Sequence, residues 1–271
     1  MTSTATVASV SATSGATPAL QTIQLEKVFG SKGAVTKALD GIDLVVEKGE
    51  FVAIMGPSGS GKSTLLNCIA TIENSTAGQI IVDGRDVTRL RGRNLTCFRR
   101  DELGFIFQDG NLIDTLSGYE NIALALSIQK APAAEIDGRV RKMADALDVA
   151  SVLDKRPSQM SGGQRQRVAA ARALVTKPKL VLADEPTGAL DSRNARIMME
   201  SLSTMNKQLS ATILMVTHDA FAASFAHRVV FVRDGRIFNQ VSAGAEGRNA
   251  LFERIMKVQA FLGGEVARND A

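Results

Sequence analysis

Cysteine and long apolar runs are scarce in this chain of 271 residues, and each shortage excludes a class of protein. The two cysteines, Cys68 and Cys97, do not form a Cys-x-x-Cys pair, which argues against a metal site built on thiolates. Two thiols in a chain of this length are typical of a reducing compartment. The most apolar stretch, residues 211–232, is interrupted by ionisable side chains, so we expect no segment to cross a bilayer.

Clusters of basic residues are also missing. The net charge is +4, but the 32 Lys and Arg residues are scattered, and no run of five or more occurs. Nucleic-acid-binding proteins usually gather such charges on one face or in one segment. We therefore expect a solvated surface and no nucleic-acid partner.

The N-terminal segment, residues 1–20, lacks the features of a secretory signal. It has no positively charged start and no continuous apolar region, and Ser, Thr, Ala and Gly dominate it. Such a composition predicts a disordered tail. The mature protein is then expected in the cytoplasm.

Hydrophobic periodicity predicts an α/β fold for the rest of the chain. Early strands, expected at residues 22–28, 51–55 and 78–84, indicate a small β-rich portion. Polar, helical sequence follows at about 90–165 and predicts an inserted helical subdomain. Apolar strands then alternate with helices, at residues 179–184, 212–217 and 229–232. Strands that are apolar throughout and separated by helices indicate a parallel sheet covered on both faces.

The stretch "GPSGSGKST" matches the phosphate-loop pattern G-x-x-x-x-G-K-[ST] in full, between a predicted strand and a predicted helix. Its glycines let backbone N–H groups converge on an anion, and the helix start adds its positive dipole end. Lys62 would contact the β and γ phosphates of a nucleotide, and Ser63 would bind Mg²⁺. The predicted nucleotide-binding set is Gly56, Pro57, Ser58, Gly59, Ser60, Gly61, Lys62, Ser63 and Thr64.

Two further strand ends carry chemically active side chains. Asp184 and Glu185 follow the apolar strand "LVLA", and such acids lie where ligands bind in parallel sheets. We expect Asp184 to hold Mg²⁺ and Glu185 to accept a proton from an attacking water. His218 ends the next strand. A lone histidine is more often structural, but this position favours contact with a γ-phosphate.

The stretch "QMSGGQRQRVAAARAL" predicts a helix that begins in an unusual way. Ser161 and Gln164 fit a capping box, in which each side chain bonds the backbone N–H of the other residue. Gly162 and Gly163 lie between them, although each glycine in a first turn costs about 1 kcal/mol relative to alanine. Their presence indicates that something approaches this helix closely.

Taken with the phosphate loop and the two acids, "SGGQ" makes residues 21–262 resemble the nucleotide-binding subunit of an ABC transporter. Gln108, in "FIFQDGN", is similar to that family's Q-loop glutamine, an Mg²⁺ ligand and catalytic residue, and Asp191, in "GALDS", to its D-loop aspartate. The resemblance implies a P-loop NTPase core with a parallel sheet, a small antiparallel β subdomain and an inserted helical subdomain. It leaves residues 263–271 as a C-terminal tail.

The same resemblance implies a homodimer with ATP bound between two copies arranged head to tail. One copy would bind ATP and Mg²⁺ through its phosphate loop, while the other copy's helix start contacts the γ-phosphate. The implied contacts across the interface come from Ser161, Gly162, Gly163, Gln164 and Asp191. Close approach would then explain the glycines.

Two positions depart from the family pattern. Met160 stands where the signature usually has leucine, and the two side chains are similar in volume. Phe29, in "KVFG", stands where a tyrosine usually stacks on adenine. A phenyl ring can still stack, although Phe29 can equally be an apolar residue at the end of a strand.

A narrower resemblance points to the ATPases of bacitracin-type peptide-antibiotic resistance transporters. It rests on "LGFIFQDGNLIDTLSGYENIALALSI" and on the tail "LFERIMKVQAFLGG". Lipoprotein-releasing and macrolide-exporting ATPases form the wider neighbourhood. The resemblance implies a separate membrane permease and a location at the cytoplasmic face of the cell membrane. Residues 109–122, with apolar Leu112, Ile113, Leu116 and Tyr119, would contact the permease unless they pack within the helical subdomain.

Other P-loop proteins fit less well. Soluble ABC-type ATPases that act on ribosomes or DNA usually carry two such domains or long coiled-coil insertions, and this chain has neither. A GTPase would need an Asn-Lys-x-Asp motif, but Asn206 and Lys207 are followed by Gln208 and Leu209. The transported substrate and the identity of the permease stay open, because substrate contacts belong to the permease.

Overall fold

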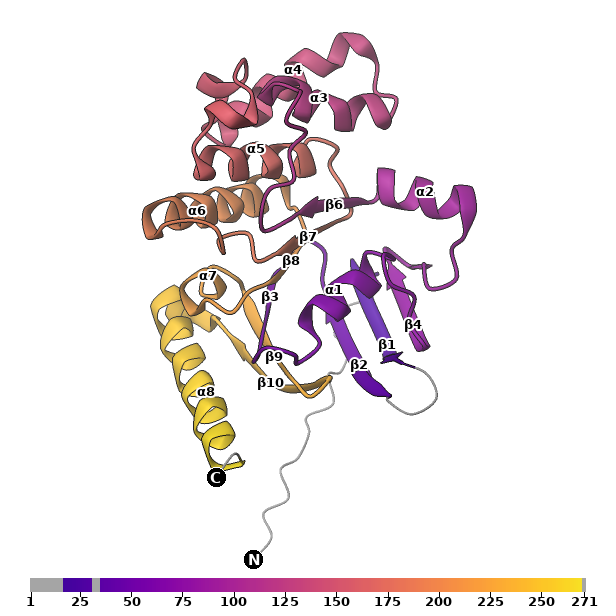
Figure 1. The fold of residues 1–271 in the computed structure, drawn as a ribbon, viewed down its shortest axis with the longest axis vertical. Coiled ribbons are helices and arrows are strands. Elements are labelled where there is room, and N and C mark those ends of the chain that lie inside the picture. Colours follow the sequence, from indigo (N-terminus) through magenta and orange to yellow (C-terminus); the bar gives the residue numbers. More distant parts are fainter. Residues whose placement is uncertain (1–16, 31–34, 270–271) are drawn as a thin grey trace, which may run out of the picture.

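A central six-stranded sheet organises the molecule, which is described here from a computed structural model of residues 17–30 and 35–269 (Figure 1). Its strands lie in the order β10-β9-β3-β8-β7-β6. All neighbours pair in parallel except β9 and β10, which are antiparallel. The bounds are β3 Phe51–Met55, β6 Leu103–Ile106, β7 Leu180–Asp184, β8 Ile213–Val216, β9 Arg228–Arg233 and β10 Arg236–Ser242.

Each inner strand of this sheet buries both of its faces. In β3, the side chains of Phe51, Ala53 and Met55 join one hydrophobic cluster, while those of Val52 and Ile54 join the other. The strands β7 and β8 divide in the same way. This two-sided burial is why their sequences are apolar throughout instead of alternating.

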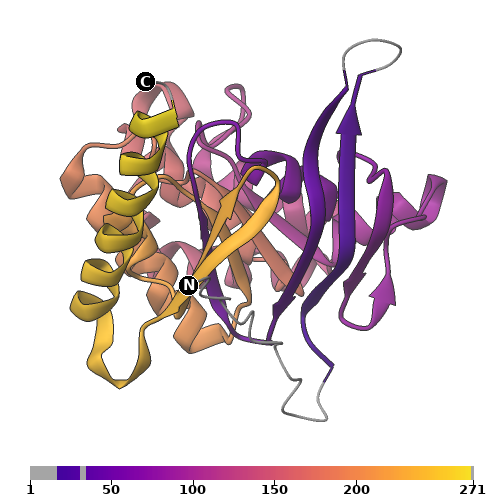
Figure 2. The same cartoon turned by 90° about the horizontal axis from the view of Figure 1, so that it is seen from below.

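A second, antiparallel sheet covers one side of the core. Its strands are β1 Leu20–Phe29, β2 Thr36–Val46, β4 Ala77–Val82 and β5 Arg85–Asp86, in the order β2-β1-β4-β5. The long strands β1 and β2 lie on the opposite side of the molecule from the last helix (Figure 2).

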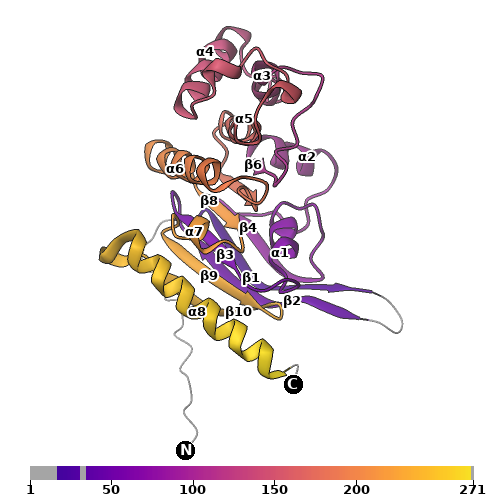
Figure 3. The same ribbon diagram turned by 60° about the vertical axis from the view of Figure 1, so that its left-hand side comes forward.

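The helices form two groups. Figure 3 shows α3, α4 and α5 together at one end of the molecule, with α8 at the other end. The helix bounds are α1 Lys62–Ile69, α2 Gly92–Asp101, α3 Gly118–Ile128, α4 Ala133–Ala146, α5 Gly162–Leu174, α6 Ser192–Leu209, α7 Ala220–Ala223 and α8 Gly247–Asn269. Short 3₁₀ turns occupy Ala150–Val152, Pro157–Gln159 and Gly244–Glu246.

Several boundaries differ from those expected. The stretch 90–165 was expected to be mostly helical with a short strand before Gln108. That strand is β6, at the edge of the central sheet, so the compact helical layer begins only at α3. The helix α8 continues to Asn269, into the expected tail 263–271. Of the expected N-terminal tail, residues 1–16 lie outside the described residues, whereas Leu20 is already a buried strand residue. The strands β2 and β10 were not predicted at all.

The described part of the chain shows the length and polarity of its helices and the state of its two cysteines. Within residues 17–30 and 35–269, no helix is both long and apolar enough to cross a membrane. Cys68 and Cys97 are free thiols. Burial raises the pKa of the Cys68 thiol to about 11, as expected for a thiol packed among apolar side chains.

Candidate active site

Four adjacent strands end at one edge of the central sheet and bring the predicted site residues together. In the order β3, β8, β7 and β6, their carboxyl ends lead to Gly56, His218, Asp184 and Gln108. Parallel strands place their carboxyl ends at the same edge, where ligands bind in α/β folds.

The loop after β3 requires glycine for steric reasons. A Cβ at Gly56 would lie 2.0 Å from the carbonyl oxygen of Val232, and one at Gly61 would lie 2.3 Å from that of Ala38. Both glycines also have positive φ angles. These two positions therefore fix the path of the loop, and α1 starts directly after it at Lys62, where a helix start favours an anion.

Lys62 is almost fully buried and lies back along this loop. Its Nζ donates hydrogen bonds to the carbonyl oxygens of Gly56 and Pro57, at 2.9 and 2.7 Å. Burial lowers the pKa of the Lys62 ammonium, while the carboxylates of Glu185 and Asp184 act in the opposite direction. A lysine ammonium in a phosphate loop binds phosphate oxygens as a point charge, which suits Lys62 to a nucleotide.

Asp184 fits an Mg²⁺ site. Burial raises the pKa of its carboxyl, the negative charge of Glu185 raises it further, and Lys62 opposes both effects. The Oδ1 atom of Asp184 and the hydroxyl of Ser60 are buried and have no hydrogen-bond partner within the protein. Among the described residues, no group of three or more His, Cys, Asp or Glu side chains could hold a metal ion. Mg²⁺ commonly needs only one or two carboxylates when phosphates complete its shell.

Glu185 and His218 form a close pair. The Nδ1 atom of His218 lies 2.5 Å from Oε2 of Glu185, with the glutamate mostly shielded and the histidine exposed. Glu185 has a φ angle of 46°, in the left-handed region that such residues seldom adopt. Backbone strain of this kind is concentrated at functional sites. The carbonyl oxygen of His218 accepts a 3.2 Å hydrogen bond from Gln259 on α8.

Gln108 lies close to the same chain segment, from the β6 side. A Cβ at Gly188 would lie 3.1 Å from Nε2 of Gln108, and the N–H of Gly188 donates to the carbonyl of Glu185 at 2.9 Å. The structure thus brings Lys62, Asp184, Glu185, His218 and Gln108 to one edge of the sheet.

The start of α5 has the predicted capping box. The N–H of Gln164 donates to the hydroxyl of Ser161 at 3.2 Å, and the N–H of Ser161 donates to Oε1 of Gln164 at 2.9 Å. The two glycines differ. A Cβ at Gly162 would meet only ordinary contacts, but one at Gly163 would lie 2.2 Å from Oδ1 of Asn194. The side chain of Asn194 therefore favours glycine at position 163 from within this chain, and no local sequence pattern reveals this contact.

Asp191 lies at a helix cap, and Phe29 lies at the end of a strand. Asp191 caps α6: its Oδ1 accepts from the N–H of Asn194 at 2.9 Å, and these hydrogen bonds lower the pKa of its carboxyl. Phe29 ends β1 with 40% of its surface exposed, and Nζ of Lys27 lies 4.6 Å from the centre of its ring. An exposed ring at this position suits a stacking role.

The segment 109–122 contains both packed and exposed side chains. Leu112 and Tyr119 pack against the large hydrophobic cluster, whereas Ile113 is 42% exposed. The fully buried Asn121 holds the backbone turn at residues 113–117 through side-chain hydrogen bonds. Its Oδ1 accepts from the N–H of Ile113, and its Nδ2 donates to the carbonyl oxygens of Ile113, Leu116 and Ser117. Sequence reasoning missed Asn121, which looks like a solvated residue within a polar stretch.

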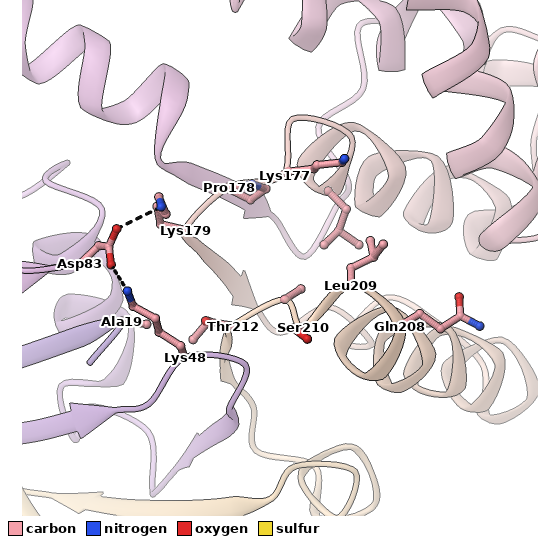
Figure 4. Close-up of a pocket in the computed structure, with 12 residues that line it drawn as sticks. Ala19, Lys48, Asp83, Lys177, Pro178, Lys179, Gln208, Leu209, Ser210 and Thr212 are labelled. Carbon is pink, nitrogen blue, oxygen red and sulfur yellow. Dashed lines mark ion pairs between the residues drawn. The ribbon is translucent and has the colours of Figure 1, made fainter. Parts of the chain in front are cut away.

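A cavity lies elsewhere, near the amino ends of β7 and β8. It has a volume of about 420 Å³, and Lys48 and Lys179 at its rim both pair with Asp83 (Figure 4). These ion pairs lower the pKa of Asp83. None of the predicted site residues lines it, so it is separate from the phosphate loop.

Comparison with known proteins agrees with this geometry. Residues 39–188 match the sequence profile of the ABC transporter family. The bacitracin export ATP-binding protein BceA of Halalkalibacterium halodurans is 48% identical over 245 residues, which cover 90% of this chain and 97% of that protein. The chain belongs to the ABC transporter family. The predicted family, α/β fold class and ATPase activity are confirmed.

Other relatives lie in the predicted neighbourhood. The ABC transporter ATP-binding protein YvcR of Bacillus subtilis is 48% identical and covers 91% of this chain and 95% of its own length. The macrolide export ATP-binding/permease protein MacB of Brucella melitensis is 42% identical over 83% of this chain, but that match covers only 35% of MacB. A dimeric, post-hydrolysis structure of the ATP-binding cassette MJ0796 with ADP and Pi covers 82% of this chain and 98% of its own, with a TM-score of 0.75 and 36% identity.

Proposed function

We propose that this ABC ATPase powers a separate membrane permease, and that two copies act together at the cytoplasmic face of the cell membrane. The observation that carries the proposal is the convergence of Lys62, Asp184, Glu185 and His218 on adjacent strand ends. The names of the relatives, an export ATP-binding protein and a fused ATP-binding/permease protein, support the link to a permease.

Within one copy, the phosphate loop and Lys62 would hold the β and γ phosphates of ATP. Ser63, Asp184 and Gln108 would hold Mg²⁺, which supplies charge neutralisation on the phosphates when bound. Glu185 would accept the proton of the attacking water. Its contact with His218 would orient both side chains at the γ-phosphate. Positioning and charge stabilisation account for nearly all of the catalysis in phosphoryl transfer.

The second copy would complete the site. Ser161 is exposed at the start of α5, and a Cβ at Gly162 would meet nothing closer than Leu190 at 3.7 Å. A γ-phosphate could therefore approach the helix start, where the dipole and free N–H groups favour an anion. Gln164 supports this indirectly, through the capping box. The dimeric state of the similar MJ0796 cassette supports the arrangement.

For the transported substrate, we propose a peptide antibiotic, in resistance or export. The support is the 48% identity to a bacitracin export protein over nearly the whole of both chains. Release of lipoproteins or export of macrolides is the alternative, and the 42% identity to MacB supports the latter. Ile113, exposed in the segment that follows Gln108, is the leading candidate for contact with the permease.

A susceptibility experiment tests this function. The gene is deleted in its own host and restored as wild type or as Lys62→Ala, and the inhibitory concentrations of bacitracin and erythromycin are measured. We expect deletion to lower the tolerated bacitracin concentration, and only the wild type to restore it. A change with erythromycin alone would favour macrolide export. No change with either drug, together with no permease from a neighbouring gene co-purifying in detergent, would refute the proposal.

A further inference from the structure

The loop that carries Gln108 is tied to α5 by three side-chain hydrogen bonds. We call residues 107–111 the glutamine loop. Nε2 of Gln166 donates to the carbonyl oxygen of Phe107 at 2.7 Å, and Gln166 is only 2% exposed. Arg172 donates through Nη2 to the carbonyl of Gly110 at 2.8 Å and through Nη1 to that of Asn111 at 2.7 Å. One of these bonds holds the residue before Gln108, and the other two hold residues that follow it.

The donors are well suited to fix a backbone. A guanidinium presents its N–H groups in a rigid fork, so Arg172 can hold two successive carbonyl oxygens at once. Hydrogen bonds from a charged donor are about twice as strong as neutral ones. Arg172 is half-buried, and this burial lowers the pKa of its guanidinium.

The loop also fits the helix closely. A Cβ at Gly110 would lie 3.0 Å from Oε1 of Gln166 and 3.5 Å from the Cβ of Ala169. The N–H of Gly110 closes a turn onto the carbonyl of Phe107 at 3.0 Å. With its main chain held in this way, the loop presents Gln108 outward against Gly188, next to the segment of Glu185.

We propose that Arg172 and Gln166 are positioning residues for Gln108: they hold the glutamine loop on α5, so that the glutamine side chain stays against Gly188, in the segment that follows Glu185. The inference rests on the proposed role of Gln108 as an Mg²⁺ ligand. It also means that one helix carries both the anchor of Gln108 and, at its first turn, Ser161.

A double-mutant cycle tests the inference with the full-length protein. Steady-state hydrolysis of MgATP is measured for wild type, Arg172→Ala, Gln108→Ala and the double variant. We expect Arg172→Ala to lower kcat about tenfold, as loss of buried bonds to a charged group would. In the Gln108→Ala background, the same change should alter kcat by less than about twofold, because a residue that acts only through Gln108 has nothing left to position. Arg172→Lys should fall between, since lysine cannot hold both carbonyls.

Two further measurements separate positioning from a general loss of structure. The half-saturating Mg²⁺ concentration should rise in Arg172→Ala, while the Kd for ADP in EDTA stays at the wild-type value, because the phosphate loop is untouched. Arg139→Ala is the matched control. It removes a 2.8 Å bond from an arginine to the carbonyl of Val175, at the same carboxyl end of α5 but away from the glutamine loop, and should leave the Mg²⁺ dependence unchanged.

Equal losses from Arg172→Ala in the wild-type and Gln108→Ala backgrounds would overturn the inference, and so would an unchanged kcat. If Arg139→Ala shifts the Mg²⁺ dependence as much as Arg172→Ala does, the effect belongs to the helical layer and the inference also fails. Wild-type protein whose hydrolysis does not depend on Mg²⁺ would refute the proposed site itself and, with it, this inference.

Discussion

Replacing Glu185 by glutamine tests the shared-site proposal most directly. Glutamine keeps the shape of the side chain and can still accept the hydrogen bond from His218, whose Nδ1 lies 2.5 Å from the glutamate. It cannot take a proton from water. The binding groups Lys62, Ser63 and Asp184 are unchanged, and removing the charge of Glu185 takes away one cause of the raised pKa of Asp184. Nucleotide binding should therefore survive.

We expect Glu185→Gln to lower the hydrolysis rate by the factor that a general base contributes. Such a group contributes about 10²- to 10⁴-fold, which corresponds to about 2.7–5.5 kcal/mol at ~1.36 kcal/mol per tenfold change in rate. ATP should then persist between two copies and hold them together, because the Ser161 helix of each copy contacts the γ-phosphate bound to the other.

Size-exclusion chromatography gives the readout. The Glu185→Gln protein should elute as a dimer with MgATP and as a monomer with ADP. Adding Ser161→Arg should abolish the dimer, because a long side chain then fills the space where close approach is needed. A Glu185→Gln protein that stays monomeric at saturating MgATP would refute a sandwich formed by the isolated subunit. Repeating the experiment with the permease would show whether the permease is needed.

Other substitutions give further tests of the site, of its stability and of the permease contact. Lys62→Ala should abolish hydrolysis and weaken ADP binding, measured by phosphate release and calorimetry; hydrolysis at the wild-type rate would disprove the site. Asp184→Asn should raise Tm by about 3 °C at pH 8. Because the pKa of Asp184 is raised by burial, the wild type loses stability as pH rises through that pKa, and the gain should shrink towards pH 4. Asn121→Ala should lower the free energy of unfolding by about 2–4 kcal/mol in denaturant titration, since buried groups lose their partners. A cysteine at Ile113 should cross-link to the permease, while one at exposed Ile128 should not.

The sequence was most informative where strands are buried on both faces. The strands β3, β7 and β8 are apolar at every position facing either cluster, so their pattern, and the chemistry at their ends, could be recognised before any coordinates. The strand β10 could not be recognised, because most of its side chains are exposed and it lies at a sheet edge. The strand β2 was hidden by register irregularities in its pairing with β1.

The residues of the candidate site also differ in how well the sequence predicts them. Phosphate-loop and acid positions follow from local sequence, since each depends on residue type at a fixed spacing after a strand. The contacts of Arg172 and Gln166 with the glutamine loop join residues about 60 positions apart along the chain. Nothing in local sequence distinguishes these side chains from others on a polar helix. These long-range hydrogen bonds could therefore be recognised only in the structure.

The contact between Gly163 and Asn194 has a consequence for the history of this chain. Asn194 bonds to Asp191 through both its backbone N–H and its side-chain amide, so its position is set by the start of α6. A Cβ at position 163 would overlap that amide. A side chain at position 163 would then be tolerated only if the residue at position 194 shifts or becomes smaller. Among distant relatives, positions 163 and 194 should accordingly covary, and a lineage that lost this asparagine could accept alanine in its signature without losing the ability to fold.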